Sequence, residues 1–260
     1  MPGFDKHSLS SSPYIHIENV SRRFGPVTAV SEVSFSLGKG NILGVLGSDG
    51  AGKTTLLRMI ATMIPPSSGK IGVNGLDVVD RKAQVKELIG YMPQRFGLYQ
   101  DLTVAENLDF FMDIYGISGD ERVQRRSEYL GFSNLLPFLD RLAGDLSGGM
   151  KQKLGLACVL VHQPQILILD EPTNGVDPVS RQEFWGILER MKRQNMTILV
   201  STAYMDEGEK CDRLILMHRS RILDDATPQE MRERFDDLEQ AMIHRIERVD
   251  EGLADDHFNR

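Results

Sequence analysis

Apolar and polar positions along the chain predict strands of two kinds. Residues 14–20 and 33–37 alternate apolar and polar side chains, which is typical of strands with one exposed face. Residues 166–169 are continuously apolar, which favours a strand buried on both faces of a parallel sheet. The other segments expected to form strands of the sheet are residues 41–46, 89–92, 197–200, 214–217 and 221–223.

Apolar residues at helical spacing predict helices that cover these strands. Two of them lie at residues 54–63 and 178–193, and a third begins at residues 146–150. The side chains expected on their inward faces are Leu56, Leu57, Ile60 and Met63 in the first, Phe184, Ile187, Leu188 and Met191 in the second, and Leu154, Ala157, Cys158 and Val161 in the third.

The stretch between residues 95 and 145 predicts a helical insertion. Thr103 and Glu106 form a capping box, which opens a helix through Tyr115, and a second, charged helix covers about residues 120–130. No convincing strand interrupts them. We therefore expect a helical subdomain over about residues 95–162, inside a domain that spans residues 14–223.

Both ends of the chain differ from this body. Residues 1–13 are rich in Ser, Gly and Pro and lack the apolar segment of a signal peptide, so we expect a flexible N-terminus. Thr227 and Pro228 predict a terminal helix, with Thr at the N-cap and Pro at the first helical position. We expect this helix to run to about Glu247 and the last dozen residues to be loose.

The net charge of −7 lies in the tail, because residues 224–260 hold 12 acidic and 5 basic residues while residues 1–223 hold 25 of each sign. A neutral body with an acidic tail argues against nucleic-acid binding, which needs a basic face. No apolar run approaches the roughly 18 residues of a membrane-spanning helix. With Cys158 and Cys211 expected as free thiols in a reducing compartment, the composition indicates a cytosolic protein.

A glycine-rich loop follows the strand expected at residues 41–46. Its glycines let backbone N–H groups close on phosphate oxygens, and the next helix points its positive end at the same place. Lys53 is placed to reach the β- and γ-phosphates, and the Thr54 hydroxyl to bind Mg²⁺. The loop consists of Gly47, Ser48, Asp49, Gly50, Ala51, Gly52, Lys53, Thr54 and Thr55. This pattern predicts binding of a nucleoside triphosphate, and by itself it leaves kinases, GTPases and motor proteins open.

Two further features narrow the chemistry. Asp170 ends the apolar strand and is placed to hold Mg²⁺ opposite Thr54, while Glu171 beside it is placed to polarise an attacking water. Ser147, Gly148 and Gly149 put a hydroxyl and glycine N–H groups at the start of another helix, which makes a second anion site. One phosphate chain rarely needs two such sites in one molecule.

Over about residues 14–223 the chain resembles an ABC-type ATP-binding cassette. The glycine-rich loop, Gln94, residues 146–149, the Asp170–Glu171 pair and residues 174–177 follow the order and spacing of that family. The resemblance implies an α/β P-loop fold with a mainly parallel central sheet, an N-terminal antiparallel β subdomain and an inserted helical subdomain. It also implies that ATP and Mg²⁺ lie between two cassettes, each of which completes the other's site with its residues 147–149.

The resemblance also implies roles for single residues. Glu171 would be the catalytic base, and Gln94 would sense Mg²⁺ and the attacking water and relay to a transport partner. Asp177 would report across the cassette interface. Phe24, which spacing alone leaves open as a core residue, would stack on adenine. Residues 90–99 and 146–157 are similar to the ABC-2 exporter branch, and most similar to the first cassette of its fused two-cassette multidrug-export subunits.

Three positions depart from the family pattern. Ala203 stands where a His usually contacts the γ-phosphate, and loss of one such transition-state contact costs on the order of 3 kcal/mol, about a hundredfold in rate. Asp49 replaces the usual Asn, and we expect its side chain to face away from the phosphates. Met150 replaces a frequent Gln. We therefore expect intact ATP binding and slow hydrolysis.

These features together predict the ATPase subunit of a membrane exporter, cytoplasmic and peripheral on the inner face of the plasma membrane. Its expected partners are a second cassette and a separate integral-membrane permease, which would dock on residues 95–145. Two alternatives stay open. A soluble ABC protein acting on ribosomes would need paired cassettes and basic surfaces, which this chain lacks. A nucleotide-gated module in which ATP only controls dimerisation is kept open by Ala203.

Overall fold

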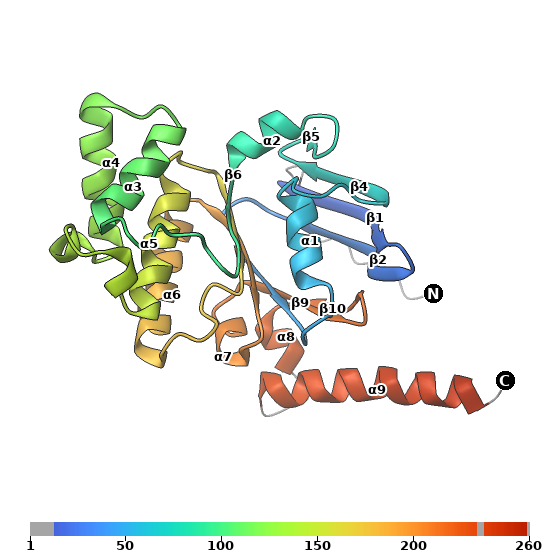
Figure 1. Ribbon diagram of the computed structural model, residues 1–260. Helices are drawn as coiled ribbons and strands as arrows, with labels where there is room; N and C mark the ends of the chain where they lie inside the picture. Colours follow the sequence, from blue (N-terminus) through green and yellow to red (C-terminus); the bar gives the residue numbers. More distant parts are fainter. Residues whose placement is uncertain (1–12, 233–236, 259–260) are drawn as a thin grey trace.

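The computed structural model describes residues 13–232 and 237–258 and divides them between two sheets with flanking helices (Figure 1). The expected flexible segment falls almost entirely on residues 1–12, outside the described residues. The larger sheet has the strand order β10-β9-β3-β8-β7-β6. Its parallel strands are β3 (Ile42–Leu46), β6 (Ile89–Met92), β7 (Ile166–Asp170), β8 (Thr197–Thr202) and β9 (Arg213–His218), and β10 (Arg221–Ala226) runs antiparallel to β9. The predicted mainly parallel sheet is confirmed.

The smaller sheet is antiparallel and has the order β2-β1-β4-β5. Its strands are β1 (Ile15–Phe24), β2 (Val27–Leu37), β4 (Ser68–Val73) and β5 (Leu76–Asp77). The first two are longer than predicted, because Phe24 pairs with Val27 across a turn in which Gly25 has a φ of 56°. Residues 22–24 therefore continue a strand and do not connect two strands. Glycine tolerates this left-handed conformation, which allows the hairpin to close tightly.

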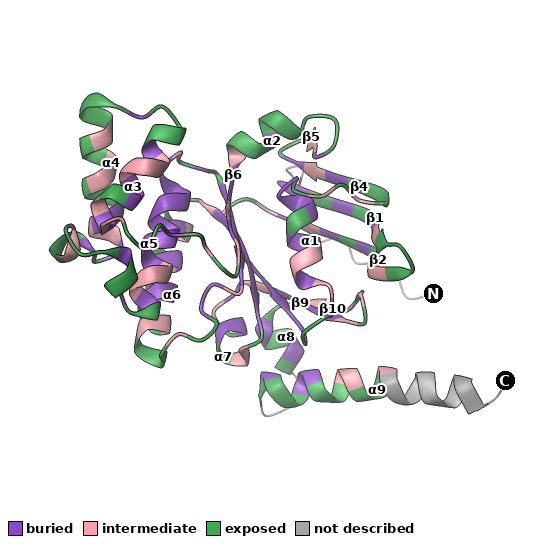
Figure 2. Ribbon diagram, viewed as in Figure 1, coloured by how far each residue is buried: buried purple, intermediate pink, exposed green. Residues whose placement is uncertain are grey.

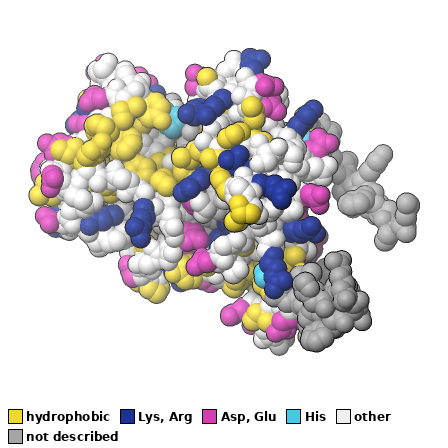
Figure 3. Space-filling view, turned by 45° about the vertical axis from the view of Figure 1, so that its right-hand side comes forward, with side chains coloured by type: hydrophobic (Ala, Val, Ile, Leu, Met, Phe, Trp, Pro, Cys, Tyr) yellow, Lys and Arg dark blue, Asp and Glu magenta, His cyan; other side chains and the backbone are white. Residues whose placement is uncertain are grey.

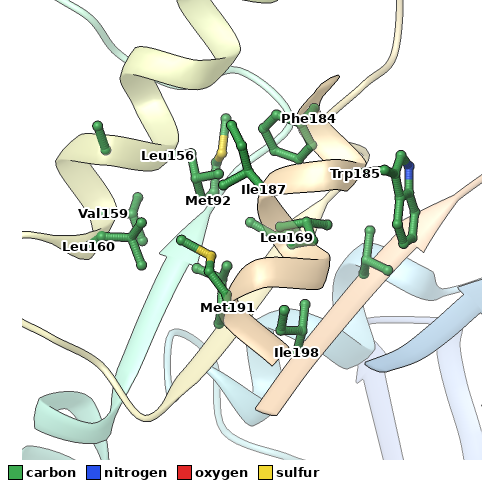
Figure 4. Packing of buried hydrophobic residues seen from close by; sticks show 14 of the residues in the cluster. Met92, Leu156, Val159, Leu160, Leu169, Phe184, Trp185, Ile187, Met191 and Ile198 are labelled. Carbon is green, nitrogen blue, oxygen red and sulfur yellow. The ribbon is translucent and has the colours of Figure 1, made fainter. Parts of the chain in front are cut away.

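The two faces of the parallel sheet belong to two apolar clusters. Leu43 and Val45 of β3 face one cluster, which includes the antiparallel sheet and helix α1 (Lys53–Ile60). Ile42 and Leu46 face the other, which includes α5 (Gly148–Leu160) and α6 (Pro178–Arg193). Figure 4 shows the second cluster, where Phe184, Ile187 and Met191 of α6 pack toward Leu156 and the strands. The strands at the centre are almost wholly buried, as Figure 2 shows.

Helices alone form the stretch expected to be an insertion, apart from one isolated bridge between Thr103 and Leu142. The capping box is confirmed: Thr103 Oγ1 accepts from the Glu106 N–H at 3.2 Å, and Glu106 Oε2 accepts from the Thr103 N–H at 2.8 Å. The helices are α3 (Val104–Ile114), α4 (Gly119–Phe132), the short 3-10 turns η1 (Leu136–Phe138) and η2 (Ala143–Asp145), and α5. Before them, α2 (Lys82–Leu88) leads into β6, the strand predicted at residues 89–92.

Two helical predictions are wrong. Helix α1 ends at Ile60, one turn earlier than expected, so Met63 lies beyond it and is 52% exposed. The terminal helix is not a single segment that stops near Glu247. The structure has α8 (Pro228–Arg232) and α9 (Leu238–Phe258), with residues 233–236 between them outside the described range. One side of the first turns of α9 is buried, at Leu238, Ala241 and Met242. Figure 1 shows the rest of the helix running outward from the body.

Candidate nucleotide-binding site

The glycine-rich loop connects β3 to α1 and requires glycine at two positions. Gly47 has a φ of 151°, and a Cβ there would lie 2.3 Å from the Met217 carbonyl oxygen. Gly52 has a φ of 105°, and a Cβ there would lie 2.3 Å from the Ala29 carbonyl oxygen. Both clashes are with backbone atoms, which cannot rotate away. The loop can therefore pack against β2 and β9 only with glycine at these two places.

Lys53, the first residue of α1, is buried within this loop. Its Nζ donates to the carbonyl oxygens of Gly47 at 2.7 Å and Ser48 at 3.2 Å. The same nitrogen lies 3.3 Å from Glu171 Oε1. One cation therefore links the loop to the residue that follows β7.

The Thr54 hydroxyl meets Asp170 as the sequence predicted, since Thr54 Oγ1 donates to Asp170 Oδ1 at 2.9 Å. Asp170 is fully buried and accepts two more hydrogen bonds, from Ser201 Oγ at 2.9 Å and from Tyr91 OH at 3.2 Å. Burial raises the pKa of Tyr91, so its phenol is a stable donor. Sequence reasoning did not identify Ser201 or Tyr91 as site residues, because their contacts depend on the neighbouring strands β8 and β6.

The Glu171 carboxylate is held by several donors. Gln94 Nε2 donates to Glu171 Oε2 at 2.8 Å, and Asn174 Nδ2 reaches the same oxygen at 3.2 Å. The Glu171 backbone has a φ of 49°, in the left-handed region that residues other than glycine rarely adopt. Its N–H donates to the carbonyl and the hydroxyl oxygens of Ser201, at 3.2 and 3.0 Å. The predicted residues Lys53, Gln94 and Glu171 thus lie together.

A cavity of about 480 Å³ opens over this cluster. Sequence reasoning missed one of its walls, which the first residues of β2 supply. Phe24 is not among the lining residues, is 45% exposed, and carries the Arg22 guanidinium 4.5 Å from its ring centre. The lining residues are Val27, Thr28, Ala29, Asp49, Gly50, Ala51, Gly52, Lys53, Thr54, Thr55, Gln94 and Glu171.

A second, smaller cavity of about 200 Å³ adjoins Glu171 on the side of Ala203. Ala203 is exposed and follows directly after β8. Asp49 borders both cavities, although we expected its side chain to face away from the phosphates. The other lining residues are Thr173, Asn174, Thr202 and Tyr204. A small side chain at position 203 therefore leaves open space beside the carboxylate of Glu171.

The Ser147–Gly149 segment does not line either cavity in this chain. Ser147 caps α5, because its side chain accepts from the Met150 N–H at 3.3 Å. A Cβ at Gly149 would lie 2.4 Å from the Ser180 side chain, so the start of α5 packs closely against α6. Ser147 and Gly148 are exposed.

Asp177 caps α6, and its Oδ1 accepts from the Ser180 N–H at 2.9 Å. The hydrogen bonds from Ser180 lower the pKa of Asp177 below its usual value. Since Gly149 touches the same Ser180, the start of α5 and the start of α6 form one continuous exposed edge. Neither Ser147 nor Asp177 lines the cavity over the glycine-rich loop of the same chain.

This fold and this loop define a P-loop nucleotide-binding protein with an inserted set of helices. The ABC transporter family profile matches residues 30–174. The chain is 45% identical over 216 residues to the probable multidrug ABC transporter ATP-binding protein YbhF of Escherichia coli, an alignment that covers 82% of this chain and 37% of YbhF. It is 39% identical over 218 residues to the ABC transporter ATP-binding protein NatA of Bacillus subtilis, covering 80% of this chain and 87% of NatA.

A solved structure with the same fold is that of cbiO1 from Clostridium perfringens, part of the ABC transporter complex cbiONQ. It is 26% identical, has a TM-score of 0.77, and the match covers 85% of this chain and 90% of that one. The chain belongs to the ATP-binding cassettes of ABC transporters. It spans little more than a third of the length of YbhF.

Among the described residues, no helix is long and apolar enough to cross a membrane. Within the same residues, no group of three or more His, Cys, Asp or Glu side chains lies close enough together to hold a metal ion by itself. Cys158 and Cys211 are free thiols, as predicted; both are buried, and burial raises the pKa of both thiols.

Proposed function

We propose that this chain is the ATP-binding and ATP-hydrolysing subunit of an exporter, and that it drives transport through a separate membrane subunit. The observation that carries the proposal is the cluster on the wall of the 480 Å³ cavity, in which the Glu171 carboxylate lies 2.8 Å from Gln94 Nε2 and 3.3 Å from Lys53 Nζ. The named functions of YbhF and NatA as transporter ATP-binding proteins support it.

The residues of the cluster have distinct tasks in this proposal. The glycine-rich loop and Lys53 bind the triphosphate, because backbone N–H groups and one cation complement its charge. Glu171 accepts a proton from the attacking water, and Gln94 orients that water by its hydrogen bond to the same carboxylate. Phe24, on the hairpin next to the cavity, stacks on the base after the exposed ring turns toward it.

Mg²⁺ fits the oxygen atoms that Thr54 and Asp170 bring together. A hydroxyl and a carboxylate 2.9 Å apart are hard oxygen ligands of the kind Mg²⁺ prefers, and the Gln94 side chain borders the same cavity. When bound, the ion supplies charge neutralisation for the phosphates. The buried Ser201 and Tyr91 donors fix the Asp170 carboxylate for this task.

A second cassette completes the site. Ser147 and Gly148 are exposed at a helix start and do not border the cavity of their own chain, so they can bind a phosphate only in another copy. Asp177 lies on the same edge and would face the partner cassette. The partner is a second copy of this chain or a similar cassette.

An apolar groove supports docking of a membrane subunit from the cytoplasmic side. The groove has a volume of about 280 Å³ and is lined by the segment after α1 and by residues of α2, β6, α3 and α5. Met63 and Tyr115 line it and are about half exposed, at 52% and 50%. Figure 3 shows apolar side chains gathered on this helical part of the surface. Phe96 also lines the groove two residues after Gln94, which connects it to the nucleotide cavity.

The test of the proposed function measures ATP hydrolysis together with ATP-dependent dimerisation. Ser147→Asp keeps an N-cap side chain for α5 but places a carboxylate against the phosphates of the partner cassette. We expect the variant to bind ATP as the wild type does, and to lose both dimerisation and hydrolysis. Asp120→Asn, an exposed change in the first turn of α4, is the control and should alter neither.

A dimer that forms with ATP but never hydrolyses it would instead establish the second candidate, a nucleotide-gated module, which the alanine at position 203 favours. Wild-type chain that neither binds ATP nor dimerises would refute both. The membrane partner is tested by cross-linking in membranes with Tyr115→Asp, which should release the chain, against the exposed Val123→Asp on α4, which should not.

A further inference from the structure

Glu207 is a buried acidic residue outside both cavities. It belongs to the short helix α7 (Met205–Gly208), and its exposed fraction is 0%. Its Oε1 accepts a hydrogen bond from Thr173 Oγ1 at 2.6 Å, and its Oε2 accepts one from Thr202 Oγ1 at 2.6 Å. A buried carboxylate destabilises a fold unless such contacts compensate it. The two threonines come from different segments, so Glu207 joins them.

Arg181 in α6 adds a third segment to this junction. Its Nη1 lies 4.0 Å from Glu207 Oε1, and its Nη2 lies 3.3 Å from Asp206 Oδ2. The guanidinium also stacks on the ring of Tyr204, 4.4 Å from its centre. Arg181 is in the first turns of the helix that Asp177 caps. The segment that contains Ala203 is therefore fixed to the start of α6.

The backbone of Glu171 needs support from its surroundings. A non-glycine residue with a φ of 49° keeps that conformation only where neighbouring contacts fix it. On the N-terminal side, the Glu171 N–H is bound by the Ser201 carbonyl and hydroxyl. On the C-terminal side, Thr173 is two residues away and is bound to Glu207. Contacts thus hold Glu171 from both directions.

Both sets of contacts end on the same pair of residues. Ser201 and Thr202 are consecutive in β8, and Thr202 is bound to Glu207. Thr202 also accepts from the Tyr204 N–H at 3.0 Å, so its single hydroxyl hydrogen is committed to Glu207. The hydroxyls of Thr173 and Thr202 and the carboxylate of Glu207 therefore connect the turn that begins at Glu171 to the end of β8.

We propose that Glu207 is a positioning residue for ATP hydrolysis, which holds Glu171 in its reactive conformation through Thr173 and Thr202. The inference rests on the proposed function, because its effect is read through Glu171. Glu207 itself lines neither the large cavity nor the small one. Its loss should therefore slow the chemical step and leave nucleotide affinity unchanged, which a general loss of folding would not do.

The experiment uses the full chain with Glu207→Gln, Thr173→Val and Thr173→Ser. Affinity is measured with a fluorescent ATP analogue, and the chemical step by single-turnover hydrolysis of radiolabelled ATP. Glu207→Gln and Thr173→Val should lower the rate constant roughly 10- to 100-fold, because small misplacements of a catalytic group have effects of that size. Affinity should stay within about twofold of wild type, and Thr173→Ser, which keeps the hydroxyl, should restore the rate.

Glu209→Gln is the matched control. Glu209 lies two residues after Glu207, is exposed, and forms an ion pair with Arg232 at 3.4 Å. The variant should therefore match wild type in rate and affinity. The same series in an Ala203→His chain gives a faster background in which small rates are easier to compare. A crystal structure of the Thr173→Val variant adds a readout independent of turnover, in which Glu171 should leave the left-handed region.

Several outcomes would overturn the positioning role while the proposed function stands. They are an unchanged rate in Glu207→Gln and Thr173→Val, a Thr173→Ser rate as low as that of Thr173→Val, or an unchanged Glu171 φ in the variant structure. A wild-type chain without ATP binding would refute the proposed function itself. These two kinds of failure are distinguished by the wild-type binding measurement.

Discussion

Gln94 and Glu171 are in direct contact across the nucleotide cavity, where the amide nitrogen of Gln94 donates to the Glu171 carboxylate at 2.8 Å. The other carboxylate oxygen lies 3.3 Å from Lys53 Nζ. The two donors come from the segment that follows β6 and from the glycine-rich loop, so the direction in which Glu171 points depends on both segments. A shift of the segment that follows Gln94 would therefore change the position of the Glu171 carboxylate. This contact connects the docking groove to the chemistry.

Replacing Glu171 by glutamine should remove the base and keep the shape of the site. We expect hydrolysis to fall by about 10² to 10⁴, which is the usual contribution of a positioned general base. ATP affinity should stay the same, because Lys53 and the loop still bind the phosphates. Phosphate release and equilibrium binding measure the two effects. Glu87→Gln, an exposed change in α2, should leave both unchanged. Equal turnover in Glu171→Gln and wild type would assign the base to another residue.

Alanine at Gly52 should disrupt the loop. The added Cβ would lie 2.3 Å from the Ala29 carbonyl oxygen, at a φ of 105°. We expect a loss of about 1–3 kcal/mol in the free energy of unfolding, together with loss of ATP binding. Denaturant unfolding and nucleotide titration report these changes. Gly186→Ala in α6 meets nothing within 4 Å and should change stability by less than about 1 kcal/mol, in the stabilising direction. Normal ATP affinity in Gly52→Ala would contradict the steric argument.

Histidine at position 203 should accelerate hydrolysis. The cavity beside Ala203 has room for a larger side chain and borders Glu171, and an imidazole there can donate to the γ-phosphate. We expect turnover to rise on the order of 100-fold with little change in ATP affinity. Ala203→Phe fills the same space without a donor and should give no acceleration. If Ala203→His hydrolyses ATP at the wild-type rate, the alanine at position 203 does not limit hydrolysis.

Stability should fall in mildly acidic solution because of His162. Burial lowers the pKa of His162, and the Arg125 charge lowers it further, against a raising contribution from the Ile89 carbonyl. Its Nε2 lies 3.2 Å from that carbonyl, while its Nδ1 is buried without a hydrogen-bond partner among the described residues. As pH falls below the ordinary histidine value of about 6.5, the unfolded chain takes up a proton that the folded chain resists. The free energy of unfolding therefore decreases.

Denaturant unfolding at pH 7.5 and pH 5.5 measures this effect. His162→Gln removes the titrating group, so the difference between the two pH values should become smaller than in wild type. His16→Gln, at an exposed position on β1, serves as the control and should preserve the wild-type difference. A His162→Gln chain with the full wild-type pH dependence would place the titration elsewhere.

Motifs formed by consecutive residues could be recognised from the sequence, and so could the placement of Thr54 opposite Asp170, but most contacts between distant segments could not. The loop from Gly47 to Thr55, the Asp170–Glu171 pair and the capping box at Thr103 each lie within a few positions of the sequence, so local chemistry identifies them. Ser201 and Glu207 could not be found in this way. Their partners are fixed by the order of β6, β7 and β8 in the sheet, which apolar periodicity does not specify.

The ends of the helices were also predicted poorly from the sequence. Met63 continues the helical spacing of Leu56 and Ile60, yet Thr62 adopts a φ of 61° and the helix has already ended. Spacing records which face a residue would occupy but not where the chain leaves the helix. The same holds for the terminal segment, where charged residues gave no sign that α9 continues to Phe258.

Neighbouring residues of β3 belong to apolar clusters on opposite faces of the sheet. The nucleotide site is therefore as resistant to unfolding as the whole domain. Leu43 and Val45 are covered from one side of the sheet, and Ile42 and Leu46 from the other. Neither layer can open without exposing the strand that leads into the glycine-rich loop. Amide hydrogens of β3 and of its neighbour β8 should therefore exchange with solvent only through global unfolding, while those of the outlying α4 exchange through local opening.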